Sequence, residues 1–222
     1  MEKDLPQLYG HPFSSFTWKA LIALYERDVP FVFRVLGPDQ PENQRRIAEL
    51  SPTGQFPALV DGTREITQSN AVIAYLDLHH GDAPPMVPAD PDAAIEARMM
   101  ADTFDDYVNV PMQRIVSEAF RGEGEKDPRG VADARRALGR TYAWLEGRLA
   151  DRNWATGEAF TIADCAGAPA LFYADWVEPI PDALEGLRAY RRRVLARPSV
   201  ARVVDEARPY RPFFPLGAPD RD

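Results

Sequence analysis

Residues 55–76 read QFPALVDGTREITQSNAVIAYL, and this stretch decides the fold of the first part of the chain. Two short strand-like segments, 57–60 and 64–66, flank the dipeptide Asp61-Gly62, which is typical of two-residue hairpin turns. From Gln68 to about His79 the apolar residues recur at helical spacing. The stretch therefore predicts a β-hairpin that leads directly into a helix.

The residues upstream of the hairpin alternate between strand-like and helix-like segments. Pro6–Tyr9 and Val29–Leu36 are predicted strands, and Ser15–Arg27 and Pro41–Glu49 are predicted helices. With the hairpin and its helix the order is β-α-β-α-β-β-α, which indicates a sheet with parallel pairs and an antiparallel edge. The thioredoxin fold has this order, although other small α/β domains share it.

A proline-rich segment separates this α/β region from a helical one. Residues 81–91 combine prolines with no periodic pattern, as expected of a linker. We therefore expect a thioredoxin-like domain over residues 1–80, a linker over 81–91 and an all-helical domain over 92–222. The helices of the second domain are predicted at 93–120 (interrupted at Pro111), 130–150, 161–176, 184–196 and 199–207.

Two further features of the helical domain carry local signals. Thr161 and Asp164 have the spacing of a capping box at the start of a helix. The proline-rich tail from Pro209 contains several aromatic residues, which would be unfavourable in water. We expect this tail to be non-helical and to pack over the body of the protein.

The charge of the chain argues against nucleic-acid and membrane partners. Its 26 basic and 34 acidic residues give a net charge of −8, and such a surface repels nucleic acid and anionic lipid. Arg188–Arg193 is the densest basic run, which we interpret as a solvated helix face or an intramolecular ion-pair site. No apolar run approaches the roughly 20 residues that span a bilayer.

Cys165 is the single cysteine of the chain, so an internal disulfide and a cysteine-based zinc cluster are excluded. We expect this residue to lie in the core. The segment Met1–Pro6 lacks the basic and apolar character of a signal peptide. These features predict a cytoplasmic protein without a bound metal.

Three polar segments are predicted to converge if the first domain has the thioredoxin fold. In the first, Ser14 and Ser15 lie at a helix N-terminus, whose unpaired N–H groups favour an anion. An N-cap is the commonest role of a serine at such a place, and two serines leave one for another role.

The other two segments flank the hairpin. In Gln55-Phe56-Pro57 the bond before proline is a candidate for the cis form, an ordinary trans proline at a strand start being the alternative. A cis bond would turn the Phe56 backbone outward, where it could pair with an extended peptide. In Thr67–Asn70 the helix N-terminus, with Gln68 and Ser69, could receive a carboxylate or could simply cap the helix.

These motifs resemble those of the glutathione transferase family. The segments LYGHPFSS (8–15), GQFPALVDG (54–62) and ITQSNAVIAYL (66–76) are similar to its N-terminal domain, and WATGEAFTIAD (154–164) is similar to its helix-capping motif. The resemblance extends to about Ala207. It implies the architecture of that family, a thioredoxin-like domain followed by an all-helical one.

The resemblance also implies function. A member of this family conjugates glutathione, as co-substrate, to a small hydrophobic electrophile in detoxification, works as a homodimer and needs no metal. Ser14 falls where serine-type (theta- and zeta-like) classes carry the catalytic hydroxyl. Glutathione would be bound by Ser14, by the Phe56 backbone at its cysteinyl part, by Gln68 and Ser69 at its γ-glutamyl carboxylate, and by Gln55 at its glycyl end.

The sequence departs from two known classes of the family. Phe16 replaces the cysteine of the zeta pattern Ser-Ser-Cys-Ser, and Gly10 falls at the catalytic position of tyrosine-type classes. The electrophile is expected between the domains, and its candidate contacts are His11, Phe13, Tyr107 and Met112, for which plain packing is equally expected. A non-catalytic binding or adaptor protein, and a glutathione-dependent peroxidase or isomerase, are the alternative functions.

Overall fold

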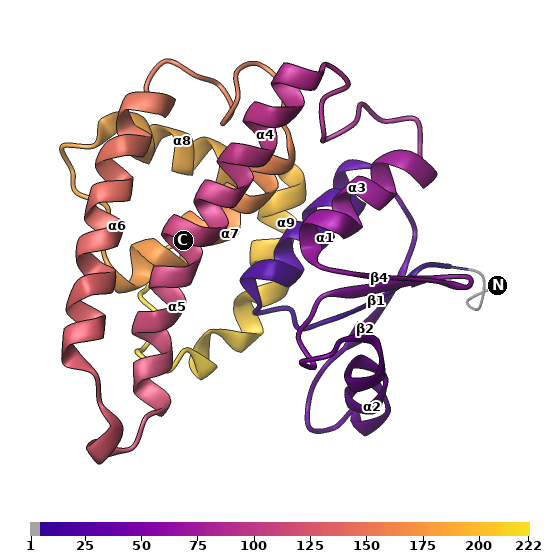
Figure 1. Ribbon diagram of the computed structural model, residues 1–222, viewed down its shortest axis with the longest axis horizontal. Coiled ribbons are helices and arrows are strands. Elements are labelled where there is room, and N and C mark those ends of the chain that lie inside the picture. Colours follow the sequence, from indigo (N-terminus) through magenta and orange to yellow (C-terminus); the bar gives the residue numbers. More distant parts are fainter. Residues whose placement is uncertain (1–4) are drawn as a thin grey trace. The chain divides into compact units, whose positions relative to one another are not determined.

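The computed structural model describes residues 5–222 of the chain. They form two compact units, one ending at Val87 and the other running from Pro88 to Asp222 (Figure 1). The prediction that Met1–Pro6 is not a signal peptide concerns residues that lie mostly outside the described part.

The first unit is built around a four-stranded mixed sheet in the order β2-β1-β3-β4. β1 and β2 pair in parallel, and β3 pairs antiparallel with both β1 and β4. The predicted β-α-β-α-β-β-α order and the thioredoxin-like fold are thus confirmed. The elements are β1 (Gln7–Gly10), α1 (Ser15–Glu26), β2 (Val32–Val35), α2 (Pro41–Leu50), β3 (Ala58–Asp61), β4 (Arg64–Thr67) and α3 (Ser69–His79).

Both faces of the sheet are covered by helices. Tyr9 and Ala58, which are paired across β1 and β3, form a buried cluster with Ile47 of α2. Their neighbours Leu8 and Leu59 are fully buried and point to the other face, because side chains alternate along a strand. Figure 1 shows α1 and α3 on the side of the sheet opposite α2.

A buried ion pair fixes the segment that follows α3. Arg27, at the end of α1, is 5% exposed and pairs with Asp77 at 2.9 Å. Asp77 also accepts the backbone N–H groups of Met86 at 3.0 Å and Val87 at 2.8 Å. Residues 81–87, the first part of the predicted linker, are therefore held against the first unit.

The second unit is helical, and α7 is its most buried element. α7 packs against α4, α5 and α8, and α6 packs against α5 and α8. Within residues 5–222, no helix combines the length and the apolar character needed to cross a membrane. The helices are α4 (Pro91–Phe104), α5 (Val110–Ser117), α6 (Pro128–Leu149), α7 (Ile162–Val177), α8 (Glu185–Leu195) and α9 (Pro198–Ala207).

A π-helical turn, Asp105–Asn109, joins α4 to α5. In this turn the N–H of Val110 donates to the carbonyl of Asp105, five residues back. Pro111 has no N–H, and in a regular α-helix its ring would clash with the carbonyl of Tyr107. The wider turn accommodates the proline, so the interruption lies one turn before the position predicted for it.

The predicted capping box begins α7. Asp164 is fully buried; it accepts the Thr161 N–H at 2.9 Å through one carboxylate oxygen and the Tyr190 hydroxyl at 2.8 Å through the other. The hydroxyl of Thr161 in turn accepts the N–H of Ala163 at 3.3 Å. Cys165, the next residue in α7, is fully buried, as expected for a core residue.

The tail after α9 differs from the prediction in two respects. Arg208–Phe213 forms a 3₁₀ helix rather than non-helical chain, because its two prolines hold φ near −65°, a value that this helix accepts. Phe214 is 6% exposed and stacks edge-on against Trp176 at 5.1 Å, whereas Phe213 is 74% exposed. Only part of the aromatic tail packs over the body.

Candidate active site

The strand register brings the three polar segments to one end of the sheet. Tyr9 pairs with Ala58, and Ala58 pairs with Thr67, so these three residues form one row across β1, β3 and β4. The chain leaves β1 toward Ser14 just after this row, enters β3 from Pro57 just before it, and leaves β4 toward Gln68. Two strand spacings, roughly 10 Å, separate the outer members of the row, a span that suits a tripeptide.

The loop between β1 and α1 is shaped by its first residue. A Cβ added to Gly10 would lie 2.6 Å from a side-chain carbon of Thr17, so only glycine fits without a shift. The Thr17 hydroxyl accepts the N–H of His11 at 3.3 Å, and the Trp18 indole donates to the carbonyl of Pro12 at 2.7 Å. Helix α1 therefore holds this loop through its own first turn.

The two serines at the start of α1 have different environments. Ser14 is the N-cap, and its oxygen accepts the N–H of Thr17 at 3.3 Å. A hydroxyl can donate its own proton while it accepts, and the side chain of Ser14 is half-buried. Ser15 lies in the first turn of the helix and is 7% exposed. Ser14 is thus the more accessible of the two hydroxyls.

His11 lies in the same loop and is neutral at physiological pH. Burial lowers the pKa of its imidazole, because the charged form loses hydration. The backbone N–H of Phe13 donates to Nδ1 of His11 at 3.1 Å, which assigns the proton of the neutral ring to Nε2. By accepting this hydrogen bond, His11 orders the loop. Phe13, two residues further on, is half-buried.

The second segment precedes β3. The Phe56–Pro57 peptide bond is cis, the form for which the sequence made it a candidate. Pro57 is buried, Phe56 is half-buried and Gln55 is exposed. The polar Gln55 side chain and part of Phe56 are therefore accessible at the end of the sheet where the register places Ser14.

The third segment begins α3. Gln68 has φ +69° and ψ 121°, a backbone region that costs a residue with a side chain about 1–3 kcal/mol. Its side chain is exposed, and within the described residues no side chain caps this helix. Ser69 follows as the first helical residue and is 5% exposed. The helix N-terminus and its positive potential are thus available to an anion.

The remaining two predicted contacts belong to the helical unit and lie in different surroundings. Met112 of α5 is 4% exposed, whereas Tyr107 of the π-helical turn is 61% exposed. Tyr107 borders a surface cavity of about 430 Å³ that is also lined by Ile95 and Met99. Their predicted contact with a substrate stays a prediction.

Sequence reasoning missed the residues that position the loop. Thr17 was assigned no role, although it fills the space beside Gly10 and accepts the N–H of His11. A threonine in the first turn of a helix is too common to be noticed. The pairing of a loop glycine with a buried threonine becomes visible only once the loop folds back onto α1.

Comparisons with known proteins identify the family to which the chain belongs. A family model described as "Glutathione S-transferase, N-terminal domain" matches residues 8–84, and one described as "Glutathione S-transferase, C-terminal domain" matches residues 113–193. A glutathione S-transferase from Hyoscyamus muticus is 25% identical over 207 residues, which cover 90% of this chain and 97% of the relative. A probable maleylacetoacetate isomerase from Caenorhabditis elegans is 26% identical over 180 residues, 79% of this chain and 81% of the relative.

A solved structure extends the likeness to three dimensions. The glutathione S-transferase of Methylobacterium radiotolerans, crystallised in complex with glutathione sulfonate, superimposes with a TM-score of 0.76 at 27% identity. The match covers 90% of this chain and 94% of that one. Because both domains match in order along the chain, the protein belongs to the glutathione S-transferase family and is a glutathione transferase.

Proposed function

We propose that this enzyme conjugates glutathione to a small electrophile, with the thiolate stabilised by the Ser14 hydroxyl. The observation that carries the proposal is the row formed by Tyr9, Ala58 and Thr67, which brings Ser14 to the end of the sheet where Gln68 begins α3. Two helix N-termini lie at that end, that of α1 for the thiolate and that of α3 for the γ-glutamyl carboxylate.

The expected interactions are sufficient for thiol activation. A thiol with a pKa near 8.5 is only a few per cent ionised at neutral pH. Lowering that pKa by about two units requires about 2.7 kcal/mol. One hydrogen bond to a charged group contributes about 1.5–3 kcal/mol, and the N-terminus of α1 adds to it. Ser14 can supply this bond while its oxygen still caps α1.

Binding of the tripeptide would use all three segments. We propose that the Phe56 backbone binds the cysteinyl part and that Gln55 binds the glycyl carboxylate. Gln68 and Ser69 would bind the γ-glutamyl carboxylate, with the uncapped N–H groups of α3. His11 and Phe13 would contact the electrophile from the loop.

Ser14→Ala tests the mechanism, and Ser15→Ala is its matched control. With a chlorodinitrobenzene as electrophile, we expect Ser14→Ala to lose about a hundredfold in kcat/KM, the effect of removing one donor to a developing charge. The ultraviolet absorbance of bound glutathione against pH should show the thiol pKa returning toward 8.5. Glutathione affinity should change little. Unchanged turnover in Ser14→Ala, or an equal loss in Ser15→Ala, would refute the assignment.

Three further assays distinguish the alternative functions from conjugation. A non-catalytic adaptor with an inactive site would not be retained on immobilised glutathione. An isomerase, the function in the name of the Caenorhabditis elegans relative, would isomerise maleylacetoacetate without consuming glutathione. A peroxidase would oxidise glutathione with a hydroperoxide, so the three substrates distinguish the reactions.

We further propose that the enzyme is a cytoplasmic homodimer. Four exposed apolar residues of the helical unit support self-association, because soluble surfaces rarely leave such groups clustered in water. These residues, the apolar patch hereafter, are Ile95, Met99, Tyr107 and Trp144. The single cysteine is compatible with the glutathione-rich, reducing cytoplasm.

A further inference from the structure

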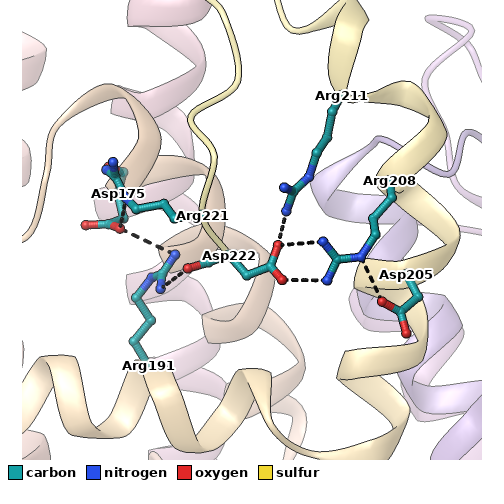
Figure 2. A network of polar contacts seen from close by, with 7 residues as sticks. All are labelled: Asp175, Arg191, Asp205, Arg208, Arg211, Arg221 and Asp222. Atoms are coloured by element: carbon teal, nitrogen blue, oxygen red, sulfur yellow. Dashed lines mark hydrogen bonds and ion pairs between the residues drawn. The ribbon is translucent and has the colours of Figure 1, made fainter.

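The basic run of α8 continues into a network of arginines that the proposed reaction does not use. Arg191 of this run is 8% exposed, although a charged side chain is rarely buried unless it is paired. Figure 2 shows Arg191, Arg208 and Arg211 directed at Asp222 from separate parts of the helical unit. We refer to these three arginines as the arginine triad.

Asp222 contacts every member of the arginine triad. Its carboxylate accepts two hydrogen bonds from Arg208, at 2.5 and 3.3 Å, in the fork geometry that guanidinium groups favour. Nη2 of Arg211 donates to the same carboxylate. Nη1 of Arg191 donates to the main-chain oxygen of Asp222 at 2.9 Å.

Other groups hold Arg191 and Arg208 in place independently of Asp222. Arg191 pairs with Asp175 of α7 at 3.4 Å, and its Nε donates to the carbonyl of Leu171 at 3.3 Å. Arg208 pairs with Asp205 at 2.9 Å. Because these partners precede the tail in the sequence, the guanidinium groups would stay close together if residues 214–222 moved away.

The triad has positive charge beyond what its fixed partners neutralise. Burial lowers the pKa of Arg211, and the neighbouring charge of Arg208 lowers it further. Among the described residues, Nη2 of the buried Arg191 has the 3.4 Å ion pair with Asp175 and no hydrogen bond. The cavity of about 320 Å³ beside Arg191 is lined by acidic as well as basic residues, among them Asp175, Asp182 and Asp222, and not by Arg208 or Arg211. Space for a small anion at the triad would therefore come from displacement of the Asp222 carboxylate.

We propose that the arginine triad is a carboxylate-binding site whose ligand is the side chain of Asp222, and that a small oxyanion binds there when the tail is displaced. Binding of Asp222 keeps Phe214 packed against Trp176. Release of Asp222 would loosen residues 214–222 and expose these aromatic side chains. The helical unit would thus carry an anion-sensitive tail, independent of the glutathione site.

Proteolysis of the native protein tests the first part of the proposal. Leu216 is 47% exposed, and chymotrypsin cleaving after it would release residues 217–222, which mass spectrometry detects. Asp222→Asn keeps the shape of the side chain and removes its charge. We expect release to accelerate about tenfold, the population change that corresponds to about 1.4 kcal/mol. Asp151→Asn changes an exposed aspartate outside the network and should leave the rate unchanged.

Substitution of Arg208 tests whether this arginine is the partner of the Asp222 carboxylate. Arg208→Gln should accelerate release to a similar extent, and the double variant Asp222→Asn/Arg208→Gln should be no faster than either single variant. Such non-additivity is expected of residues in direct contact. Additive effects, or a rate for Asp222→Asn equal to that of the wild type, would overturn the proposal.

Inorganic phosphate tests the second part. At ionic strength matched with sodium chloride, phosphate should raise the Tm of Asp222→Asn in a saturable manner, because it binds the folded state at the vacated arginines. The wild type should gain less, and Asp222→Asn/Arg208→Gln should gain nothing beyond the chloride control. Equal shifts in all three proteins would show general salt stabilisation and refute an anion site.

Discussion

Gln68 has a backbone conformation that opposes stability and favours ligand binding. Its φ of +69° lies in a region that glycine adopts without penalty, and its side chain is exposed at the N-terminus of α3. Strain of this kind persists where the surrounding structure enforces it, and it is concentrated at functional sites. A substitution at Gln68 can therefore separate the stability of the fold from glutathione binding.

Gln68→Gly should stabilise the fold and weaken the enzyme. Relief of strain predicts a gain of up to about 1 kcal/mol in the free energy of unfolding, measured by urea denaturation. Loss of the amide should raise the Kd for glutathione about tenfold, measured by calorimetry. Gln68→Ala retains the strained backbone and should lose affinity without gaining stability. If Gln68→Gly bound glutathione as tightly as the wild type, the side chain would have no role in binding.

His11 should make the stability of the loop depend on pH. Burial lowers the pKa of His11 in the folded state, so the unfolded chain takes up a proton at a higher pH than the folded one. The stabilisation is therefore complete above the unfolded pKa of about 6.5 and is lost as the pH falls below it. Protonation of Nδ1 would also eliminate the hydrogen bond from the N–H of Phe13.

His11→Asn tests this dependence, because its side-chain oxygen can accept the same N–H but does not titrate. Between about pH 7 and about pH 5, the Tm of the wild type should fall more than that of the variant. His79 and His80 are present in both proteins, so their effects cancel in the difference. Parallel Tm curves would show that His11 does not carry the pH dependence.

At the scale of elements, the α4–α5 connection contains an unfavourable buried group. Asn109, in the π-helical turn, is 2% exposed, and neither its amide oxygen nor its amide nitrogen has a hydrogen-bond partner among the described residues. A buried polar group left unpaired costs about 1–3 kcal/mol. Leucine has nearly the same shape without this cost.

Asn109→Leu should therefore raise the free energy of unfolding by about 1–2 kcal/mol. Thermal and urea denaturation would measure the gain, with Asn109→Ala as the control. The alanine variant removes the polar group but leaves a cavity, so it should be less stable than the leucine variant. If Asn109→Leu were less stable than the wild type, the amide would be satisfied by ordered water.

The elements that sequence reasoning found are those with local signals. The hairpin and the capping box at Thr161 are determined by neighbouring residues, and both were predicted. The two-residue turn of the hairpin is Gly62-Thr63 rather than the predicted Asp61-Gly62, because Asp61 still pairs with Arg64. The interruption predicted at Pro111 lies one turn earlier, in the π-helical turn, because the ring of Pro111 would clash with a carbonyl four residues back.

The candidate site shows the same division between local and distant contacts. Ser14, Phe56 and Gln68 were selected as candidates from short motifs. The motif at Gln68 did not predict the positive φ of this residue. The role of Thr17 and the buried pair of Arg27 with Asp77 depend on residues that meet only in three dimensions. No periodicity or turn signal reports such contacts.

At the scale of the whole molecule, the net charge and the exposed apolar surface have opposite effects on self-association. The net charge of −8 opposes self-association through unspecific contacts. The apolar patch favours self-association instead. Ile95 of α4 is 64% exposed, and Tyr107 of the π-helical turn that continues α4 is 61% exposed. In the proposed dimer, a specific interface would bury these side chains.

Ile95→Glu should convert the proposed dimer into a monomer. In a symmetric dimer each substitution occurs twice, so two unpaired carboxylates would be buried in one interface, where each is strongly unfavourable. Light scattering after size-exclusion chromatography should then give half the wild-type mass at low micromolar concentration. Phe120→Glu is the matched control, because Phe120 is 76% exposed and lies about 20 Å beyond Tyr107 at the helical rise. If Phe120→Glu dissociates the dimer and Ile95→Glu does not, the interface lies elsewhere on the helical unit.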